Sequence, residues 1–397
     1  MWKLPAGAEF VLSRLHQAGY QAYVVGGCVR DTLLGKVPKD WDVCTNALPH
    51  EMKQVFADCH VIETGLQHGT LTVMYQQEPF EVTTFRVDGE YTDHRHPDEV
   101  IFVADVREDL SRRDFTVNAM AWSPETGVVD AFCGQEDLER RLIRCVGEPE
   151  KRFQEDALRI MRALRFASVY GFAIDPATDA AIHALKDTLT GVAAERIRVE
   201  LAKLLCGDSA GDILRAYPDV MQVIMPQLCK VDWPSTVAAV EAAPAEEIKR
   251  LTMLLHQLSP AETKAVLTSL KPDNFTRDWV LMLVTNQEYP FQPTRHSLLK
   301  ALSLFGETET YELLTVRQAK GAADVEPLRD VLGEVLLDGI CYSVKDMAVN
   351  GRDMLALGAK GKAVGECLSY LLSLLIEEKL PNEREELLAA AKAHLGV

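Results

Sequence analysis

Residues 26–31 read Gly-Gly-Cys-Val-Arg-Asp, and residues 39–42 read Lys-Asp-Trp-Asp. A strand-like run, Ala22–Val25, leads into the glycine pair, and a helix-length segment separates the two motifs. Side chains at positions i and i+2 of a strand point to one face, so Asp40 and Asp42 can hold a hard cation together. A glycine turn that opens a helix offers backbone N–H groups to a phosphate. Together the motifs predict metal-dependent transfer of a nucleotide from a triphosphate.

Taken singly, each of these motifs has an ordinary explanation. An Asp-x-Asp is also common in turns and at solvated strand edges, and a Gly-Gly pair occurs in plain tight turns because glycine tolerates positive φ. No Gly-Lys-Ser/Thr follows the glycines, which excludes the phosphate loop of ATPases. The prediction therefore depends on the order and spacing of the two motifs together.

The composition is that of an ordinary globular protein with room for several domains. The chain has 397 residues, of which 47% are hydrophobic and 25% charged. Nine scattered cysteines without a Cys-x-x-Cys pair argue against a disulfide framework or a zinc site and suit a reducing cytosol. The N-terminus has no apolar leader, and the longest apolar run, Tyr370–Ile376, is too short to span a bilayer. We expect a cytoplasmic protein without membrane contacts.

The net charge of −17 is unusual for a protein that binds nucleic acid, because phosphate contacts need basic side chains. Residues 1–150 contain 14 Lys and Arg against 25 Asp and Glu, and residues 211–397 contain 19 against 26. Residues 151–210 contain 9 against 8 and form the one segment that is not acidic. Any RNA is therefore expected to bind a local basic patch, largely by shape.

The pattern of hydrophobic residues divides the chain into a mixed α/β head and a long helical remainder. Strands are expected at 22–25, 41–44, 69–75, 80–86 and 99–103, and almost everything beyond Glu148 has helical periodicity. Glycines and prolines punctuate the helical part and predict domain boundaries near residues 147, 208 and 320.

Two further motifs in the head carry candidate functional groups. Glu81 lies on an expected strand and is either a third active-site carboxylate or a surface residue; the sequence is equally consistent with both. Arg112 and Arg113 begin a run of hydrogen-bonding side chains that ends at Asn118. Guanidinium groups match phosphate bidentately, although from this stretch alone a capped, salt-bridged helix start is the better explanation.

Residues 155–166 read Glu-Asp-Ala-Leu-Arg-Ile-Met-Arg-Ala-Leu-Arg-Phe, and as one helix they place acidic and basic side chains opposite an apolar arc. A solvated face of i, i+3 and i+4 ion pairs would look similar. A functional interpretation is more specific. A carboxylate accepts from the exocyclic amino group of cytosine or adenine, and a guanidinium donates to ring acceptors. An Asp156/Arg159 pair facing the base would therefore accept C and A while rejecting U and G.

Two other segments give weaker signals. Residues 86–97, which include His94 and His96, form a polar stretch with Gly and Pro between two expected strands, and we expect a mobile loop with solvated histidines. Near the C-terminus, residues 349–353 and the glycine- and lysine-rich residues 358–365 precede an apolar helix. They could hold an RNA phosphate, or they could be a plain loop-to-helix junction.

In this order, the motifs closely resemble those of the bacterial class II tRNA nucleotidyltransferase and poly(A) polymerase family. The strong matches span roughly residues 20–170, and Asn350–Asp353 resembles the tail of the shorter CCA-adding members. The resemblance implies an α+β fold in which a polymerase β-like nucleotidyltransferase head, with a mixed sheet and helices, precedes an all-helical neck, body and tail. The implied bounds are a catalytic head at 1–146, a nucleotide-selecting neck at 147–207, a body at 208–320 and a tRNA-binding tail at 321–397.

The resemblance also implies the roles of individual residues. Asp40 and Asp42 would be the catalytic, Mg²⁺-binding carboxylates. The nucleotide-binding residues would be Gly27, Arg30 and Arg113 for the triphosphate and Asp156, Arg159, Arg162 and Arg165 for the incoming nucleotide. The substrates would be CTP, ATP and the 3′ end of tRNA, with the tRNA held by its acceptor stem and elbow. The implied activity is template-independent addition of C, C and A with release of pyrophosphate.

Rival activities within the family differ in recognisable features. Members that add only CC lack the flexible loop that residues 86–97 supply, and the absence of a His-Asp dipeptide argues against a phosphohydrolase domain. Poly(A) polymerases tend to carry a basic C-terminal extension, whereas residues 211–397 are acidic. An A-adding enzyme or a poly(A) polymerase remains the alternative. A catalytically silent RNA-binding protein fits less well, because the metal carboxylates and the Asp156/Arg159 pair are both intact. The sequence leaves the oligomeric state open.

Overall fold

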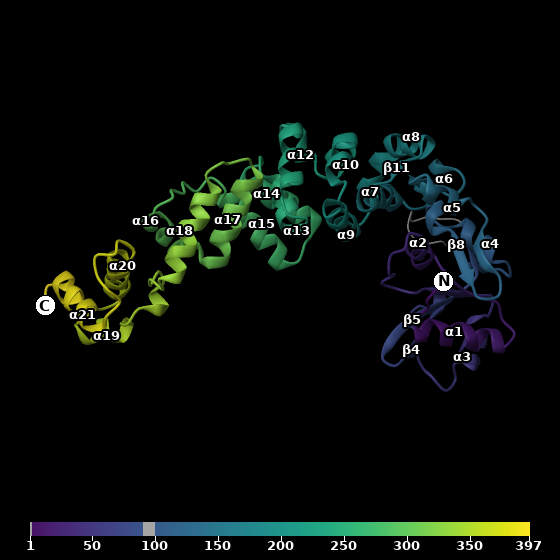
Figure 1. Cartoon of the computed structure of the whole chain (residues 1–397), viewed down its shortest axis with the longest axis horizontal. Helices are drawn as coiled ribbons and strands as arrows, with labels where there is room; N and C mark the ends of the chain where they lie inside the picture. The colour runs from purple at the N-terminus through teal and green to yellow at the C-terminus, as the bar shows by residue number, and fades with distance from the viewer. Residues whose placement is uncertain (1, 90–99) are drawn as a thin grey trace. The chain divides into compact units, whose positions relative to one another are not determined.

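The computed structural model of the protein describes residues 2–89 and 100–397 (Figure 1). By contacts within the chain it divides into two compact units, residues 1–229 and 230–397, called here unit 1 and unit 2. This division is coarser than the expected one into head, neck, body and tail, so those four domain boundaries stay predictions.

Unit 1 begins with a seven-stranded mixed sheet in the order β3-β4-β5-β2-β1-β8-β9. β1 pairs antiparallel with β2 and β8, whereas β2 pairs parallel with β5. The strands of unit 1, inside and outside this sheet, are β1 (Ala22–Val25), β2 (Val43–Thr45), β3 (His60–Ile62), β4 (Thr70–Tyr75), β5 (Glu78–Thr84), β6 (Arg86–Asp88), β7 (Val100–Phe102), β8 (Met120–Ser123), β9 (Gly127–Asp130), β10 (Leu142–Ile143) and β11 (Ala173–Ile174).

Helices surround this sheet and then continue as a helical extension of the same unit. The helices of unit 1 are α1 (Ala6–Gln17), α2 (Gly27–Leu33), α3 (Pro49–Val55), α4 (Val106–Ser111), α5 (Gly134–Glu139), α6 (Pro149–Glu155), α7 (Leu158–Tyr170), α8 (Pro176–Leu185), α9 (Ala194–Leu205), α10 (Ala210–Ala216) and α11 (Pro218–Ile224). A short 3₁₀ turn, η2 (Thr116–Asn118), precedes β8.

The alternation of side chains along β1 explains how both faces of the sheet are covered. Tyr23 and Val25 share one face, where they pack in a cluster with Val106 and Leu110 of α4. The other face meets α1, whose residues Val11, Leu12 and Leu15 are buried. Figure 1 shows α1 and α3 beside β4 and β5. All four residues of β1 are buried, so this strand and its neighbours form the centre of the head.

The helical part of unit 1 is built around α7, which packs along α9. Its residues Ile160, Met161 and Leu164 are fully buried, as the helical periodicity predicts. The short parallel pair β10–β11 joins this region to the head, because Leu142 and Ile143 pair with Ala173 and Ile174. The sequence pattern did not indicate these two strands, which are only two residues long and carry no alternation of their own.

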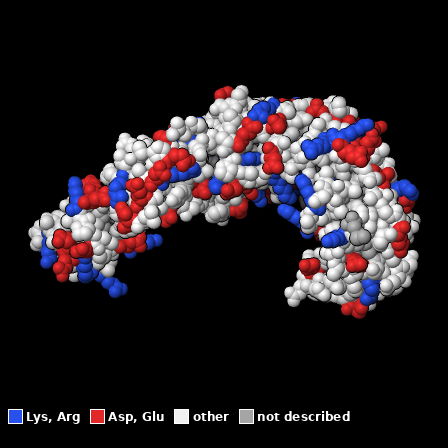
Figure 2. Space-filling model, in the orientation of Figure 1, with Lys and Arg blue, Asp and Glu red and all other residues white. Residues whose placement is uncertain are grey.

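Unit 2 is all helical. Its helices are α12 (Trp233–Ala242), α13 (Glu247–Leu255), α14 (Pro260–Leu270), α15 (Asn274–Asn286), α16 (Arg295–Phe305), α17 (Glu307–Ala319), α18 (Val325–Leu337), α19 (Gly351–Ala356), α20 (Lys362–Ile376) and α21 (Arg384–Leu395). The last three helices enclose a hydrophobic cluster of their own, in which Cys367, Leu371 and Leu387 are fully buried. On the face shown in Figure 2, groups of Lys and Arg lie next to groups of Asp and Glu in both units.

Together these elements confirm the expected α+β class with a mixed sheet and a mostly helical remainder. Among the residues that the structure describes, no helix is both long and apolar enough to cross a membrane. Residues 90–99, which contain most of the expected loop with His94 and His96, lie outside the described part of the chain. The flanking segments, β6 and β7, pair as an antiparallel ribbon.

Candidate active site

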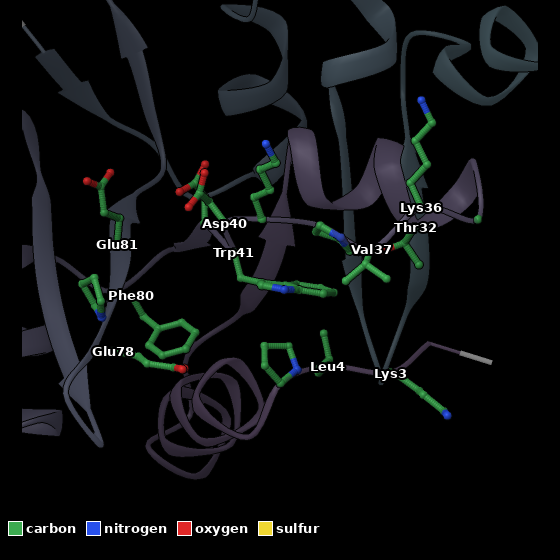
Figure 3. Close-up of a pocket in the computed structure, with 16 residues that line it drawn as sticks. Lys3, Leu4, Thr32, Lys36, Val37, Asp40, Trp41, Glu78, Phe80 and Glu81 are labelled. Carbon is green, nitrogen blue, oxygen red and sulfur yellow. The ribbon is translucent and has the colours of Figure 1, made fainter. Parts of the chain in front are cut away.

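The two aspartates of the Asp-x-Asp motif lie at the entrance to the central strand β2. The strand expected at 41–44 begins two residues later, at Val43, so Asp42 as well as Asp40 lies in the segment that leads into β2. The backbone N–H of Val25 donates to the carbonyl of Asp42 at 3.0 Å, which continues the β1–β2 ladder by one residue. Because Val43 pairs with Val82 in the parallel register, Asp42 stands beside Glu81 of β5. Figure 3 shows the Asp40 and Glu81 carboxylates directed to the same side of Trp41 and Phe80.

The electrostatics of these carboxylates favour a bound cation. Desolvation raises the pKa of Asp42, the charges of Glu81 and Asp40 raise it further, and the guanidinium of Arg113 opposes them. The excess of negative charge is what a divalent cation with oxygen ligands would relieve. Within residues 2–89 and 100–397, no three acidic, histidine or cysteine side chains converge as a complete ligand set. A cation on Asp40 and Asp42 would thus depend on substrate oxygens as further ligands, which is usual for Mg²⁺.

The glycine turn brings Arg113 to the start of α2. Gly26 has φ +80°, and a Cβ atom there would lie 2.8 Å from Nη1 of Arg113, so only glycine fits both the backbone and the contact. Arg113 also pairs with the buried carboxylate of Asp109 at 3.4 Å. Its Nε is buried and has no hydrogen-bond partner among the described residues. The glycine turn, Arg113 and Asp42 are therefore neighbours, as expected for a triphosphate site.

Arg30 follows the glycine turn on α2, and protein groups surround its guanidinium. The side chain is buried and donates to Asn118 Oδ1 and, at 2.9 Å, to Asp31 Oδ1. It also lies over the rings of Phe166 and Tyr170, with its Cζ at 5.1 and 4.7 Å from the two centroids. Direct contact of Arg30 with a triphosphate remains a prediction. In this structure Arg30 ties α2 to α7.

Asp114 continues this network toward the helical region. Its Oδ1 accepts from Asn118 Nδ2 at 3.0 Å, and its Oδ2 accepts from Arg162 Nε at 2.8 Å. Although burial alone would raise the pKa of Asp114, the charge of Arg162 and the bond from Asn118 hold it far below its ordinary value. Arg165 pairs with Glu200 at 2.5 Å and stacks on Phe166 with its Cζ 3.8 Å from the ring centroid. Arg162 and Arg165 are thus fixed side by side.

The expected single helix through residues 155–166 is wrong, because it is interrupted at Asp156. There the backbone is extended, with φ −146° and ψ 104°, and separates α6 from α7. The Asp156 carboxylate accepts from the N–H of Leu158 at 3.1 Å and so caps the following turn. It also accepts two bonds from Arg196 of α9, at 2.7 and 3.3 Å. A capping carboxylate competes with helix continuation, which periodicity alone does not reveal.

Arg159 is close to Asp156 in sequence but has other partners. Its guanidinium is buried and donates to Glu155 at 2.9 Å and to the carbonyl oxygen of Arg112 at 3.1 Å. Arg196 of α9 holds Asp156 in a fixed orientation, and the backbone just after α4 does the same for Arg159. No observation tests their contact with a base, so these roles stay predictions.

The sequence reasoning missed several residues that hold the site together. Asn118 stood inside the recognised motif, but nothing there indicated that it joins Arg30 to Asp114. Arg196, Glu200 and Tyr170, whose hydroxyl donates to Asp31 at 2.9 Å, gave no sequence signal, because their partners lie far away along the chain. In unit 2, Asn350 caps α19, and Asp353 pairs with Arg384. The Asn350–Asp353 motif thus has a structural explanation.

Comparisons with known proteins agree along nearly the whole chain. Residues 22–144 match a family model described as the poly A polymerase head domain. Residues 171–230 match one described as a probable RNA and SrmB-binding site of polymerase A, and residues 243–391 match a putative second domain of tRNA nucleotidyltransferase. The chain is 37% identical over 395 residues to a CCA-adding enzyme of Levilactobacillus brevis, with 96% of each chain covered. It is 36% identical to that of Geobacillus stearothermophilus, with 96% of this chain and 94% of that protein covered.

Solved structures give the same result. The crystal structure of the Bacillus stearothermophilus CCA-adding enzyme in complex with CTP superposes with a TM-score of 0.84 at 31% identity and covers 100% of this chain and 98% of that one. A Thermotoga maritima CCA-adding enzyme complexed with tRNA has a TM-score of 0.70 at 21% identity, with 98% and 94% covered, and shows the shared fold alone.

Proposed function

Because the chain belongs to the family of CCA-adding enzymes, we propose that it adds C, C and A from CTP and ATP to the 3′ end of tRNA. In each step the terminal 3′-hydroxyl loses its proton and attacks the α-phosphorus. The new O–P bond forms as the bond to the β-phosphate breaks, and pyrophosphate leaves. The observation that carries this proposal is the setting of Asp42, which extends the β1–β2 ladder next to β5 and whose carboxylate is influenced by the charges of Asp40, Glu81 and Arg113.

Asp40 and Asp42 are the residues that would hold Mg²⁺. When bound, Mg²⁺ lowers the pKa of the attacking hydroxyl and stabilises charge on the leaving pyrophosphate. The chain's own contribution is to fix the two carboxylates at the end of a buried strand. The carboxylates repel one another, and a cation held by them needs substrate oxygens as further ligands. Both points support a cation that binds together with the nucleotide.

We propose that Gly27 and Arg113 bind the triphosphate and that Arg30 supports them. Arg113 is partly exposed, has a buried Nε without a partner among the described residues, and lies against the glycine turn. A planar guanidinium in that place can bind two phosphate oxygens. Arg30 is proposed to act mainly by positioning, since its bonds to Asp31 and Asn118 set where α2 begins relative to η2.

Asp156 and Arg159 are proposed to select the base, with Arg162 and Arg165 contacting the nucleotide beside them. Selection by protein groups requires side chains that do not reorient to suit a wrong base. Arg196 clamps the Asp156 carboxylate, and Glu155 and a backbone carbonyl hold Arg159. The support for this proposal is that fixed geometry, together with the match of a carboxylate to the amino groups of cytosine and adenine.

Two further parts of the proposal concern the cellular compartment and the contacts to tRNA. None of the nine cysteines is in a disulfide bond, which supports a reducing compartment, and we propose the cytoplasm as the site of action. We propose that tRNA is held by its acceptor stem and elbow, with the helices after α18 as the contact at the elbow. The relatives of known activity named above are CCA-adding enzymes, so an A-adding enzyme or a poly(A) polymerase is not favoured.

The test is extension of three tRNAs, which lack CCA, end in C, or end in CC, with Mg²⁺ and with CTP, ATP or both. Completion of all three to CCA is expected, whereas a single A added only to the CC-ended tRNA would mean an A-adding enzyme. Asp42→Asn should reduce the rate about 10³-fold or more, because metal-assisted charge stabilisation contributes several kcal/mol. The matched control is Asp212→Asn, which changes an exposed carboxylate paired with Arg215 on α10. Near-normal transfer by Asp42→Asn would refute the metal role.

A further inference from the structure

The proposed nucleotide site has two halves that lie on different elements of unit 1. Gly27 and Arg113, proposed to bind the triphosphate, lie at the start of α2 and in the segment after α4. Asp156 and Arg159, proposed to select the base, lie just before α7 and in its first turn. A ligand that contacts two sites at once gains affinity only while the geometry lets both engage. The contacts that hold α2 against α7 therefore bear on nucleotide affinity.

Tyr170, in the last turn of α7, makes several of these contacts. It is four residues after Phe166, and the two rings stack with their centroids 6.1 Å apart. The hydroxyl of Tyr170 donates to Asp31 Oδ1 on α2 at 2.9 Å. Its ring faces the guanidinium of Arg30, whose Cζ is 4.7 Å from the ring centroid. One side chain of α7 thus contacts two consecutive residues of α2.

A third residue of the same segment, Lys36, meets this ring as well. Its Nζ lies 4.5 Å from the centroid of Tyr170. Figure 3 shows the Lys36 side chain directed away from Trp41 of the catalytic segment. The backbone N–H of Lys36 donates to the carbonyl of Asp31 at 2.8 Å, so the loop after α2 folds back on the helix. Tyr170 therefore contacts both the middle of α2 and the loop that follows it.

From these contacts we propose that Tyr170 is a positioning residue, which fixes the separation between the triphosphate half and the base-selecting half of the nucleotide site. The inference rests on the proposed function and adds a residue that lies beyond the motif ending at Phe166. Tyrosine suits this role, because one side chain offers a hydrogen-bond donor and a ring face for cations. It acts through Arg30 and Asp31, which follow the glycine turn on α2.

Phe166 also faces Arg30, with the Cζ atom of Arg30 5.1 Å from its ring centroid, but it serves less well for a test. Its ring meets Arg162 and Arg165 too, with their Cζ atoms at 5.5 and 3.8 Å. A change at Phe166 would disturb two residues that are proposed to bind the nucleotide. Tyr170 lies one turn farther along α7, so a change there separates positioning from direct binding.

The experiment compares CTP with two fragments of it, cytidine and inorganic tripolyphosphate, in the full-length protein with Mg²⁺. Cytidine can fill the base-selecting half alone, and tripolyphosphate can fill the other half alone. Calorimetry gives the dissociation constant of CTP directly and those of the fragments by displacement of CTP. A residue that only positions the halves affects CTP and leaves both fragments unchanged. A residue that binds the nucleotide affects a fragment as well.

Tyr170→Leu removes the hydroxyl and the ring but keeps an apolar side chain that suits a helix. We expect the dissociation constant of CTP to rise about tenfold, a modest part of the roughly 10²–10⁴-fold gain that linked contacts can give. The constants of cytidine and tripolyphosphate should keep their wild-type values. Tyr170→Phe retains the ring that faces the two cations and should restore most of the CTP affinity.

Lys36→Met tests the same contact from the other side and does not disturb packing, because Lys36 is exposed. It should weaken CTP binding about threefold, within the range of one cation–π contact at an exposed site, and leave tripolyphosphate binding unchanged. A parallel fall in tripolyphosphate affinity would contradict this, because Lys36 would then attract the triphosphate by its own charge.

The matched control for Tyr170 is Tyr217→Leu, at the end of α10. The hydroxyl of Tyr217 donates to Asp179 at 2.5 Å, and its ring stacks on that of His183 with centroids 5.2 Å apart. Both partners belong to α8. This variant loses a hydrogen bond and a ring contact within the same unit. It should lower stability while CTP affinity stays at the wild-type value.

The outcomes separate this inference from the proposed function. Wild-type CTP affinity in Tyr170→Leu would overturn the positioning role, and so would fragment constants that rise together with that of CTP. Equal losses of CTP affinity in Tyr170→Leu and Tyr217→Leu would overturn it too, because general destabilisation would then explain both. Failure of the wild type to extend any of the three tRNAs would refute the proposed function. In that case, a loss of CTP affinity confined to the Tyr170 and Lys36 variants, with the fragments unchanged, would still support the positioning role.

Discussion

The two units differ in how many charged side chains they bury. In unit 1 the buried set includes six charged residues: Arg30, Asp109, Asp114, Asp137, Arg159 and Glu200. In unit 2 it consists of Arg250 and five threonines: Thr236, Thr252, Thr263, Thr276 and Thr310. Buried charges need partners with good geometry, whereas a threonine can satisfy itself within its own helix, as Thr252 and Thr310 do by donating to the carbonyls four residues earlier.

Burying charged side chains costs desolvation free energy, and unit 1 carries most of this cost. Replacing a buried ion pair by apolar residues is often neutral or stabilising, so the charges of unit 1 are poor evidence of stability. Three of them, Arg30, Asp114 and Glu200, belong to one continuous network between α2, η2, α7 and α9. We infer that they position the groups around the carboxylates, while unit 2 is held by ordinary helix packing. Three comparisons between matched residues of the two units, and one pH-dependent change within unit 1, test this.

The largest effect is expected at Asp114. Asp114→Ala leaves Arg162 and Asn118 without their buried acceptor, and it should lower the free energy of unfolding of unit 1 by about 3–5 kcal/mol. The matched change in unit 2 is Asp324→Ala, which breaks a similar two-bond pair with Arg317 at the surface. Its effect should be much smaller, because both partners reach solvent. Urea denaturation followed by circular dichroism measures both, and equal losses would contradict the comparison.

A pair of glycines gives the next comparison. Gly26 and Gly361 precede α2 and α20 with nearly the same backbone, φ 80° and ψ −124° against φ 56° and ψ −123°. Alanine should cost each unit about 1–3 kcal/mol, because both positions are unfavourable for L residues. Only Gly26→Ala also meets a side chain, Nη1 of Arg113 at 2.8 Å, while Gly361 has open space around it.

Gly26→Ala should therefore raise the KM for CTP and ATP as well, and Gly361→Ala should leave both KM values unchanged. Steady-state kinetics at saturating tRNA measure the difference. A normal KM in the Gly26 variant would show that Arg113 does not depend on this turn.

A smaller effect is expected on nucleotide choice. Arg196→Ala removes the clamp on Asp156 and should reduce discrimination against UTP and GTP by about tenfold, since one good contact to a base contributes about 1–3 kcal/mol. Arg317→Ala is the matched control, because Arg317 makes an equally close bidentate pair in unit 2. The measurement is the ratio of kcat/KM for CTP and UTP. Unchanged ratios in Arg196→Ala would show that Asp156 needs no positioning.

The smallest effect is expected at Tyr170, and it should depend on pH. Tyr170→Phe removes one hydrogen bond to Asp31 and should cost about 1 kcal/mol at pH 7. Burial raises the pKa of Tyr170 to about 12, whereas in the unfolded chain tyrosine ionises near pH 10. Its contribution is thus complete below about pH 10 and is lost as the pH rises from 10 to 12. The difference between wild type and variant, measured by denaturation, should shrink over that range; a constant difference would contradict it.

The sequence predicted the head better than it predicted the connections. Ala22–Val25 is β1 at the expected bounds, since a short apolar run before a glycine pair is a strong strand signal. The carboxylates and the glycine turn also lie together, because their motif is local in sequence. The break at Asp156 was missed, because the cap and the Arg196 partner compete with a helical pattern that is otherwise complete. The network of Arg30, Asn118, Asp114 and Arg162 was missed because its two outer bonds join residues 88 and 48 positions apart.

The place of β2 in the sheet has a consequence for how the protein fluctuates. In the described sheet, β2 is the fourth of seven strands, with β5, β4 and β3 on one side and β1, β8 and β9 on the other. Local opening of a sheet starts at its edges, and amide hydrogens in central strands exchange only in rare, larger openings. The segment with Asp40 and Asp42 is anchored to this central strand, whose amide hydrogens we expect to exchange late. Fraying of either edge thus leaves the two carboxylates in register, and their separation persists until the whole sheet opens.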